Sequence, residues 1–332
     1  MGAWSSPAWR AEAVAWLDEA LAAVGRTRTG DVEQPRIRPW ATVLRAPTDG
    51  GVVWMKATAP ATSFEVGLYG VLSRVVPERV LTPLAADVAR GWLVLPDGGA
   101  TLGDHRTTEQ EADGLAAALA EYGQLQRAVV PHVDELLAAG VPDMRPAVMP
   151  ERFAEALDVA AASITTDDDR AAHRQVAALT GTVEQWCHQL ARSALPASLD
   201  HNDLHPKNVL VGGLGPRRFY DWGDSVVAHP FAVTLVTLSV LRQLLDVDVD
   251  GDDPRIVAAR DAYLAGFAAR APGEDLVATL RLAGRVATIA RALTWARALG
   301  SSREQDEPVD PEWATAPLRT LEALLDEPPG GG

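Results

Sequence analysis

The residues best suited to chemistry lie in His-Asn-Asp-Leu-His-Pro-Lys-Asn-Val-Leu-Val at 201–211 and in Tyr-Asp-Trp-Gly-Asp at 220–224. A turn rich in glycine joins two short β-type runs, so a hairpin should bring Asn208 and Asp221 together. One carboxylate and one amide oxygen, completed by phosphate and water, suit Mg²⁺. Asp203, on the preceding loop, is within reach of the same point and could accept the proton of an attacking hydroxyl.

Other interpretations of these residues are weaker. Taken singly, the same Asp and Asn side chains could be ordinary turn formers. His201 and His205 have the spacing of a zinc-binding helix, but Asn202 replaces the glutamate that such a site needs and Pro206 follows at once. The run Gly-Gly-Leu-Gly at 212–215 precedes a strand, unlike a dinucleotide-binding loop. No Gly-x-x-x-x-Gly-Lys-Ser/Thr element occurs in the sequence.

The first part of the chain predicts a small lobe of mixed helix and sheet. Apolar residues recur at helical spacing before Gly25, and β-type runs follow, two of them joined by the hairpin turn Thr-Asp-Gly-Gly at 48–51. The expected helices are Pro7–Val24 and Ser63–Val76, and the expected strands are three short ones between Arg36 and Ala57, then Val80–Pro83 and Gly91–Leu95.

After the sequence Pro-Asp-Gly-Gly at 96–99 the pattern is mainly helical. The sequence therefore predicts an α+β, two-lobed fold, with a small amino-terminal lobe over residues 1–95 and a larger helical lobe over 96–332. The helices expected in the larger lobe are Thr108–Ala128, Pro150–Ile164, Arg170–Ser193, Pro230–Leu245, Pro254–Ala271, Leu276–Leu299 and Pro311–Leu325.

Composition narrows the classes of function. The 332 residues are 47% hydrophobic and carry a formal net charge of −15, so the chain can bury a core, and nucleic acid is not an expected partner. Cys187 is the only cysteine, which excludes an intrachain disulfide and fits a reducing compartment. The amino-terminal residues lack the basic and apolar regions of a signal peptide, and no apolar run is long enough to span a membrane. We expect a cytoplasmic protein that is a monomer or homodimer.

The pattern His-x-Asp-Leu-His-x-x-Asn at 201–208, together with Asp-Trp-x-Asp at 221–224, resembles the catalytic loop and metal-binding segment of the aminoglycoside phosphotransferase and choline kinase family. That family has a protein-kinase-like fold. The resemblance implies that Asp203 is the catalytic base and that His205 faces the transferred phosphate. It also implies that Asn208 and Asp221 bind Mg²⁺ and that the co-substrate is ATP or another nucleoside triphosphate.

The small lobe supplies the nucleotide-binding residues that the same resemblance implies. Lys56, at the end of Val-Val-Trp-Met-Lys, would hold the α- and β-phosphates, and Glu65 on the following helix would orient it. Lys56 shares a strand face with Trp54, which we expect to be buried. Leu95, Pro96 and Gly98 would form the hinge against adenine. Proline has no N–H, so Pro96 would offer its carbonyl and Gly98 its N–H.

Two segments depart from the family pattern. The turn between the first two strands reads Arg38-Pro39-Trp40, so the glycine-rich phosphate loop is missing. The segment Ala-His-Pro-Phe at 228–231 replaces a Gly-Asp-Pro followed by an acidic residue at a helix start. Trp295, on an arginine-rich helix, is a candidate for lining the acceptor pocket or for the core.

The expected function is transfer of the γ-phosphate of ATP to a hydroxyl of a small molecule. Amino sugars, aminoglycosides and other antibiotics are candidate acceptors. The alternative is a catalytically silent nucleotide-binding or regulatory protein with the same fold, which the two departures motivate.

Overall fold

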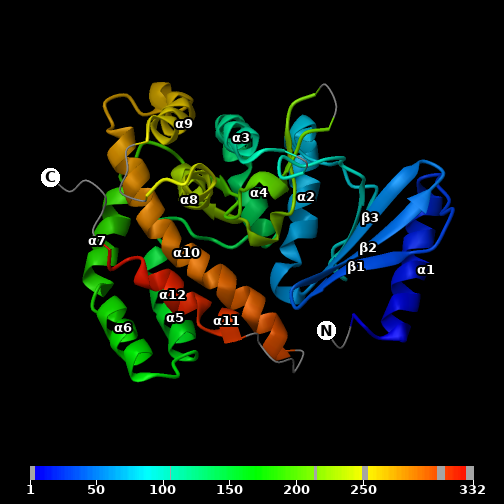
Figure 1. The fold of residues 1–332 in the computed structure, drawn as a ribbon, viewed down its shortest axis with the longest axis horizontal. Coiled ribbons are helices and arrows are strands. Elements are labelled where there is room, and N and C mark those ends of the chain that lie inside the picture. The colour runs from blue at the N-terminus through cyan, green and yellow to red at the C-terminus, as the bar shows by residue number, and fades with distance from the viewer. Residues whose placement is uncertain (1–3, 105, 213–214, 249–252, 305–310, 327–332) are drawn as a thin grey trace.

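A five-stranded antiparallel sheet forms the amino-terminal lobe of the computed structural model (Figure 1). The structure describes residues 4–104, 106–212, 215–248, 253–304 and 311–326. The strand order is β1-β2-β3-β5-β4. Their bounds are Glu33–Arg38 for β1, Ala41–Thr48 for β2, Gly51–Thr58 for β3, Ala85–Asp87 for β4 and Trp92–Pro96 for β5.

Helices lie on both sides of this sheet (Figure 1). On the outer side is α1 (Pro7–Ala23), which begins where the Ser6 side chain accepts a hydrogen bond from the Trp9 N–H. Its residues Leu17 and Leu21 pack against the sheet in a core separate from that of the larger lobe. On the inner side is α2 (Phe64–Val75), whose apolar face belongs to the main core.

The two faces of β3 differ in burial. Val53, Met55 and Ala57 are buried, and they pack into the core beneath α1. Trp54 and Lys56 lie on the opposite face and are only partly buried. The expectation that the Trp54 face is the buried one is therefore wrong, because the residues that alternate with it carry the contacts with α1.

The rest of the chain is mostly helical, as predicted. The long helix α10 crosses the larger lobe diagonally, and its carboxyl-terminal half approaches the small lobe, where it contacts the turn Pro60–Thr62 (Figure 1). The helices of this lobe are α3 (Thr108–Val129), α4 (Val133–Ala138), α5 (Met149–Ala161), α6 (Asp167–Ala177), α7 (Thr180–Leu190), α8 (Thr234–Leu245), α9 (Pro254–Ala265), α10 (Leu276–Glu304), α11 (Pro311–Ala314) and α12 (Ala316–Glu322).

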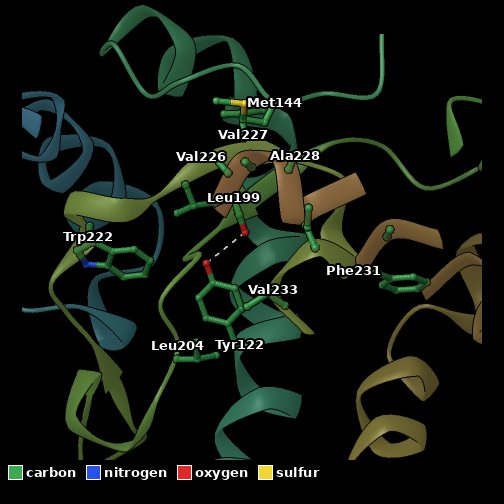
Figure 2. Packing of buried hydrophobic residues seen from close by; sticks show 14 of the residues in the cluster. Tyr122, Met144, Leu199, Leu204, Trp222, Val226, Val227, Ala228, Phe231 and Val233 are labelled. Carbon is green, nitrogen blue, oxygen red and sulfur yellow. Dashed lines mark hydrogen bonds between the residues drawn. The ribbon is translucent and has the colours of Figure 1, made fainter. Parts of the chain in front are cut away.

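Two small antiparallel ribbons break the helical pattern. One pairs β6 (Ser198–Asp200) with β9 (Val226–Ala228), and the other pairs β7 (Val209–Leu210) with β8 (Arg218–Phe219). Figure 2 shows how β6 is anchored: the hydroxyl of Tyr122 on α3 donates to the Leu199 carbonyl at 3.1 Å. Because both residues are buried, this bond fixes the strand that leads into the loop over residues 201–208.

Several predicted elements differ from the structure. The strand expected at Val80–Pro83 is wrong; β4 begins later, and Val80 forms only an isolated bridge. The helix expected over Arg170–Ser193 is two helices, α6 and α7. The helix ends near Leu179, whose N–H bonds to the carbonyl of Val176, three residues earlier. The Leu179 side chain packs against the core. Likewise the helix expected over Pro311–Leu325 is two short helices.

The remaining differences are smaller. A 3-10 turn precedes α8, and α9 ends before the 3-10 turn Ala268–Arg270. Helix α4 and the strands β6 and β9 were not predicted. Two residues of the predicted hairpin turn, Gly213 and Leu214, lie outside the described part of the chain. Within that part, the helices are too short or too polar to cross a bilayer.

Candidate active site

The loop over residues 201–208, which the sequence resemblance identifies as the catalytic loop, follows β6 and is held by its backbone conformation and hydrogen bonds. Asn202 has a left-handed backbone (φ 58°), and its N–H donates to Asp200 Oδ1 at 2.8 Å. The centre of the buried His201 ring lies 4.7 Å from the centre of the Trp222 ring. The Nε2 atom of His201 forms a hydrogen bond with the Tyr220 carbonyl at 3.1 Å. His201 thus connects the loop to the segment after β8.

Asp203 lies among three polar neighbours. His205 Nε2 is 3.3 Å from its Oδ2, Asn208 Nδ2 donates to Oδ2 at 3.2 Å, and Arg291 Nη2 donates to Oδ1 at 3.1 Å. Burial would raise the pKa of Asp203, but His205 and Arg291 outweigh it and hold the pKa at about 2. The carboxylate is therefore ionised at neutral pH, as a proton acceptor must be.

Asn208 and Asp221 lie at the open end of the β7–β8 ribbon. The register pairs Val209 with Phe219, and the Tyr220 N–H donates to the Asn208 carbonyl at 3.3 Å. Asn208 uses its amide nitrogen toward Asp203, so its amide oxygen stays available to a cation. Asp221 has a left-handed backbone (φ 63°, ψ 64°). The predicted juxtaposition therefore occurs, and its oxygen donors fit Mg²⁺.

Lys56 connects the two lobes. Its Nζ lies 2.7 Å from Glu65 Oε2 on α2 and 2.5 Å from Asp221 Oδ1, and we call these three residues the Lys56 cluster. Burial opposes the charge on Lys56, but Asp221 and Glu65 raise its pKa above its usual value. Glu65, only 1% exposed, also accepts from the Trp222 N–H at 3.1 Å. The three predicted residues thus meet in one charge cluster.

The expected hinge lies next to the β7–β8 ribbon. Leu95 and Pro96 pair with β3, and the Asp97 N–H donates to the Val52 carbonyl at 3.1 Å. Gly98 lies against Leu210 of β7, where a Cβ would come within 2.5 Å of Leu210 Cδ1. A residue with a side chain at this position would displace Leu210, so glycine allows the hinge to approach the ribbon.

The two segments that depart from the family pattern have defined structures. The turn between β1 and β2 is Pro39-Trp40, and the Trp40 ring lies 5.7 Å from that of Trp313 on α11. In the second segment, His229 takes the place of an acidic helix cap. Its Nδ1 accepts from the Phe231 N–H at 3.2 Å, and burial lowers its pKa to about 4, so the ring is a neutral acceptor at pH 7.

Sequence reasoning missed Arg291 on α10. Its Nη1 donates to the Asn202 carbonyl at 2.8 Å and to Asp224 Oδ2 at 3.1 Å, while Nη2 reaches Asp203. We call Arg291, Asp203 and Asp224 the Arg291 cluster. Burial, and next the charge of Asp203, raise the pKa of Asp224 to about 6. The only hint in the sequence was the arginine-rich character of the helix, because no spacing rule links α10 to the loop.

Trp295 lies one helical turn beyond Arg291. The Arg291 guanidinium lies 5.7 Å from the centre of its ring, and Trp295 is half-buried. It therefore borders the catalytic loop through Arg291 and is not a fully buried core residue.

Comparisons with known proteins agree on the fold. A macrolide 2'-phosphotransferase from Brachybacterium faecium is 17% identical, covers 91% of this chain and 97% of its own, and has a TM-score of 0.57. The choline kinase LicA from Streptococcus pneumoniae is 13% identical, covers 95% and 99%, and has a TM-score of 0.60. A thermostable mutant of the aminoglycoside phosphotransferase APH(4)-Ia is 14% identical, covers 92% and 98%, and has a TM-score of 0.54.

These structures establish a kinase-like fold, with its antiparallel sheet in the small lobe. A search of curated proteins found no match. The family model described as "Phosphotransferase enzyme family" matches residues 31–273, which is most of the chain. The chain belongs to the phosphotransferase enzyme family.

Proposed function

We propose that this protein transfers the γ-phosphate of ATP, or of another nucleoside triphosphate, to a hydroxyl of a small molecule. The observation that carries the proposal is that Lys56 of the small lobe meets Asp203, Asn208 and Asp221, which lie close together in a distant segment of the larger lobe. LicA has also been solved in complex with AMP, which supports nucleotide use by this fold. We keep the division after residue 95 as the proposed boundary between the lobes.

Each residue has a proposed part in the reaction. Asp203 orients the acceptor hydroxyl and accepts its proton, since its pKa of about 2 keeps it ionised. Lys56, oriented by Glu65, binds phosphate oxygens, and the Pro96 carbonyl and Gly98 N–H bind adenine beside Leu95. Asn208 and Asp221 hold Mg²⁺, which when bound neutralises charge on the phosphates. His205, 3.3 Å from Asp203, faces the transferred phosphate.

The mechanism is tested with Asp203→Ala. Nucleotide-dependent thermal stabilisation should persist, because Lys56, Asn208 and Asp221 remain, while turnover should fall about 10²- to 10⁴-fold. The matched control is Asp158→Ala, which removes one exposed carboxylate on α5, away from the proposed site, and should leave turnover unchanged. Full activity in Asp203→Ala would refute the proposed base.

A second measurement separates an enzyme from a silent protein. ATP should raise the melting temperature more with Mg²⁺ than without it, because two of the proposed ligands are protein oxygens. A silent protein would show no metal-dependent effect. Acceptors can then be screened among amino sugars, amino alcohols and antibiotics by mass spectrometry, which detects the added phosphate directly.

A further inference from the structure

A cavity lined by none of the proposed active-site residues lies at the carboxyl-terminal end of α3. Its volume is about 240 Å³. Much of its wall is apolar and comes from Leu195, Pro196, Pro230 and Phe267. Two guanidinium groups, those of Arg127 on α3 and Arg270 in the 3-10 turn after α9, complete the lining.

The position of Arg127 is built into the fold. Its guanidinium carbon lies 5.3 Å from the centre of the Phe267 ring. Gly266 provides the space beside it, because a Cβ at that residue would overlap Arg127 Nη1. A glycine and an aromatic ring on the segment after α9 therefore hold one cation at the edge of the cavity.

The charge around Arg127 is unbalanced. Burial, and next the positive charge of Arg270, lower the pKa of Arg127, and no carboxylate contributes. Among the described residues, neither Arg127 nor Arg270 has an ion pair or a side-chain hydrogen bond. Other arginines of this acidic chain do find carboxylates, as Arg28 does with Asp18 at 2.8 Å. Two neighbouring cations without a counter-charge repel each other, and an anion between them would remove that repulsion.

We propose that this cavity binds a small organic anion, with its carboxylate or phosphate group between Arg127 and Arg270 and its apolar part against Leu195, Pro196 and Pro230. Guanidinium groups present paired donors that match both kinds of anionic group. The apolar wall favours a ligand with a hydrocarbon part over a bare inorganic ion. The site is independent of phosphoryl transfer, so it can be tested whether or not the proposed function holds.

Isothermal titration at constant ionic strength provides the test, with hexanoate and hexyl phosphate as probes and acetate and inorganic phosphate as their headgroup controls. Each six-carbon probe should bind at least tenfold more tightly than its headgroup control, because several CH₂ groups leave water. The Arg127→Gln and Arg270→Gln variants should each bind the probes about tenfold more weakly. The matched control is Arg281→Gln, an exposed arginine on α10, which should bind as the original protein does.

Gly266→Ala adds a variant that keeps both charges. Its new Cβ should displace the Arg127 guanidinium and weaken probe binding by a similar factor, with the melting temperature measured alongside. If the Arg127, Arg270 and Gly266 variants all bind the probes as tightly as the original protein does, the proposed site is wrong. Equal affinity for hexanoate and acetate would overturn the role of the apolar wall, and absence of saturable binding would overturn the proposal as a whole.

Discussion

The Lys56 cluster and the Arg291 cluster both neutralise a pair of neighbouring carboxylates with one cation, but they differ in which parts of the chain they connect. Each places one cation between two carboxylates beside the catalytic loop. Lys56 joins residues from both lobes, because Glu65 lies on α2 and Asp221 follows β8. Arg291 joins only residues of the larger lobe. The first cluster therefore depends on how the lobes are docked, and the second depends on the packing of α10 alone.

The two cations also differ in how their hydrogen-bond donors are distributed. A lysine ammonium is a point charge with three donors, whereas the guanidinium of Arg291 spreads its donors over Asp203, Asp224 and the Asn202 carbonyl. We infer that Lys56 can exchange a carboxylate for phosphate oxygens, while Arg291 keeps the base in place. Four variants test this difference between the clusters.

Lys56→Met should break the cluster that joins the lobes. We expect kcat/KM to fall about 10²- to 10³-fold and the stabilisation by nucleotide to be lost. Unfolding by urea should show a loss of about 3 kcal/mol, because Glu65 stays buried without its cation. Adding Glu65→Gln should restore part of the stability and none of the activity. Retained nucleotide stabilisation in Lys56→Met would contradict the phosphate-binding role.

Arg291→Met should affect the base without affecting the nucleotide. Arg291 helps to hold the pKa of Asp203 at about 2, so its removal should raise that pKa. The acid limb of the kcat profile should move up by about 1–3 pH units, the usual effect of one neighbouring guanidinium on an aspartate, with kcat at pH 7 and the KM for ATP little changed. Arg281→Met on the same helix is the control. An unshifted profile would show that Arg291 has only a structural role.

Asp224→Asn should change the pH dependence of stability. The pKa of Asp224 in the folded protein, about 6, lies above its unfolded value, so its stabilising contribution is full below about pH 4 and declines through pH 6. The Asn variant lacks this decline. Its stability relative to the original protein should therefore rise by about 1 kcal/mol from pH 4 to pH 7, after discounting for partial exposure. Urea unfolding of both proteins at pH 4 and pH 7 measures this difference. A relative stability of the Asn variant that falls between these pH values would contradict the prediction.

Thr294→Val should give the smallest effect. The Thr294 hydroxyl accepts from Asn202 Nδ2 at 2.8 Å, which is one of the bonds that hold the catalytic loop on α10. Its loss should cost about 1 kcal/mol in unfolding free energy and change kcat modestly. Thr288→Val, a buried threonine on the same helix that bonds the Gly284 carbonyl, is the comparison. Equal losses of unfolding free energy and kcat in the two variants would mean that the Thr294–Asn202 hydrogen bond contributes nothing specific to the loop.

The two clusters also show what the sequence could predict. Asn208 and Asp221 were placed correctly because a hairpin register is local and turn chemistry fixes it. Lys56 and Glu65 were found because the resemblance supplied the pairing across strand and helix. Arg291 has no such local rule: it reaches Asp203 only because α10 packs beside the loop, and packing between distant segments leaves no periodic pattern in one sequence.

The same limit explains the errors in the fold. The long amphipathic helices were predicted well, since their periodicity extends over many residues. The three-residue strands β6 and β9 are fully buried and too short to show alternation. The break between α6 and α7 lacks a proline, and Leu179 turns toward the core for reasons of tertiary packing.

The backbone of Asp221 constrains which amino acids this position can accept. Left-handed φ and ψ cost most residues about 1–2 kcal/mol, while glycine, asparagine and aspartate adopt them readily. Of these three, aspartate alone brings a negative charge to Lys56. This position therefore requires a left-handed backbone and a negative charge together, so Asp221→Asn removes the charge alone, whereas Asp221→Ala removes the charge and also strains the backbone.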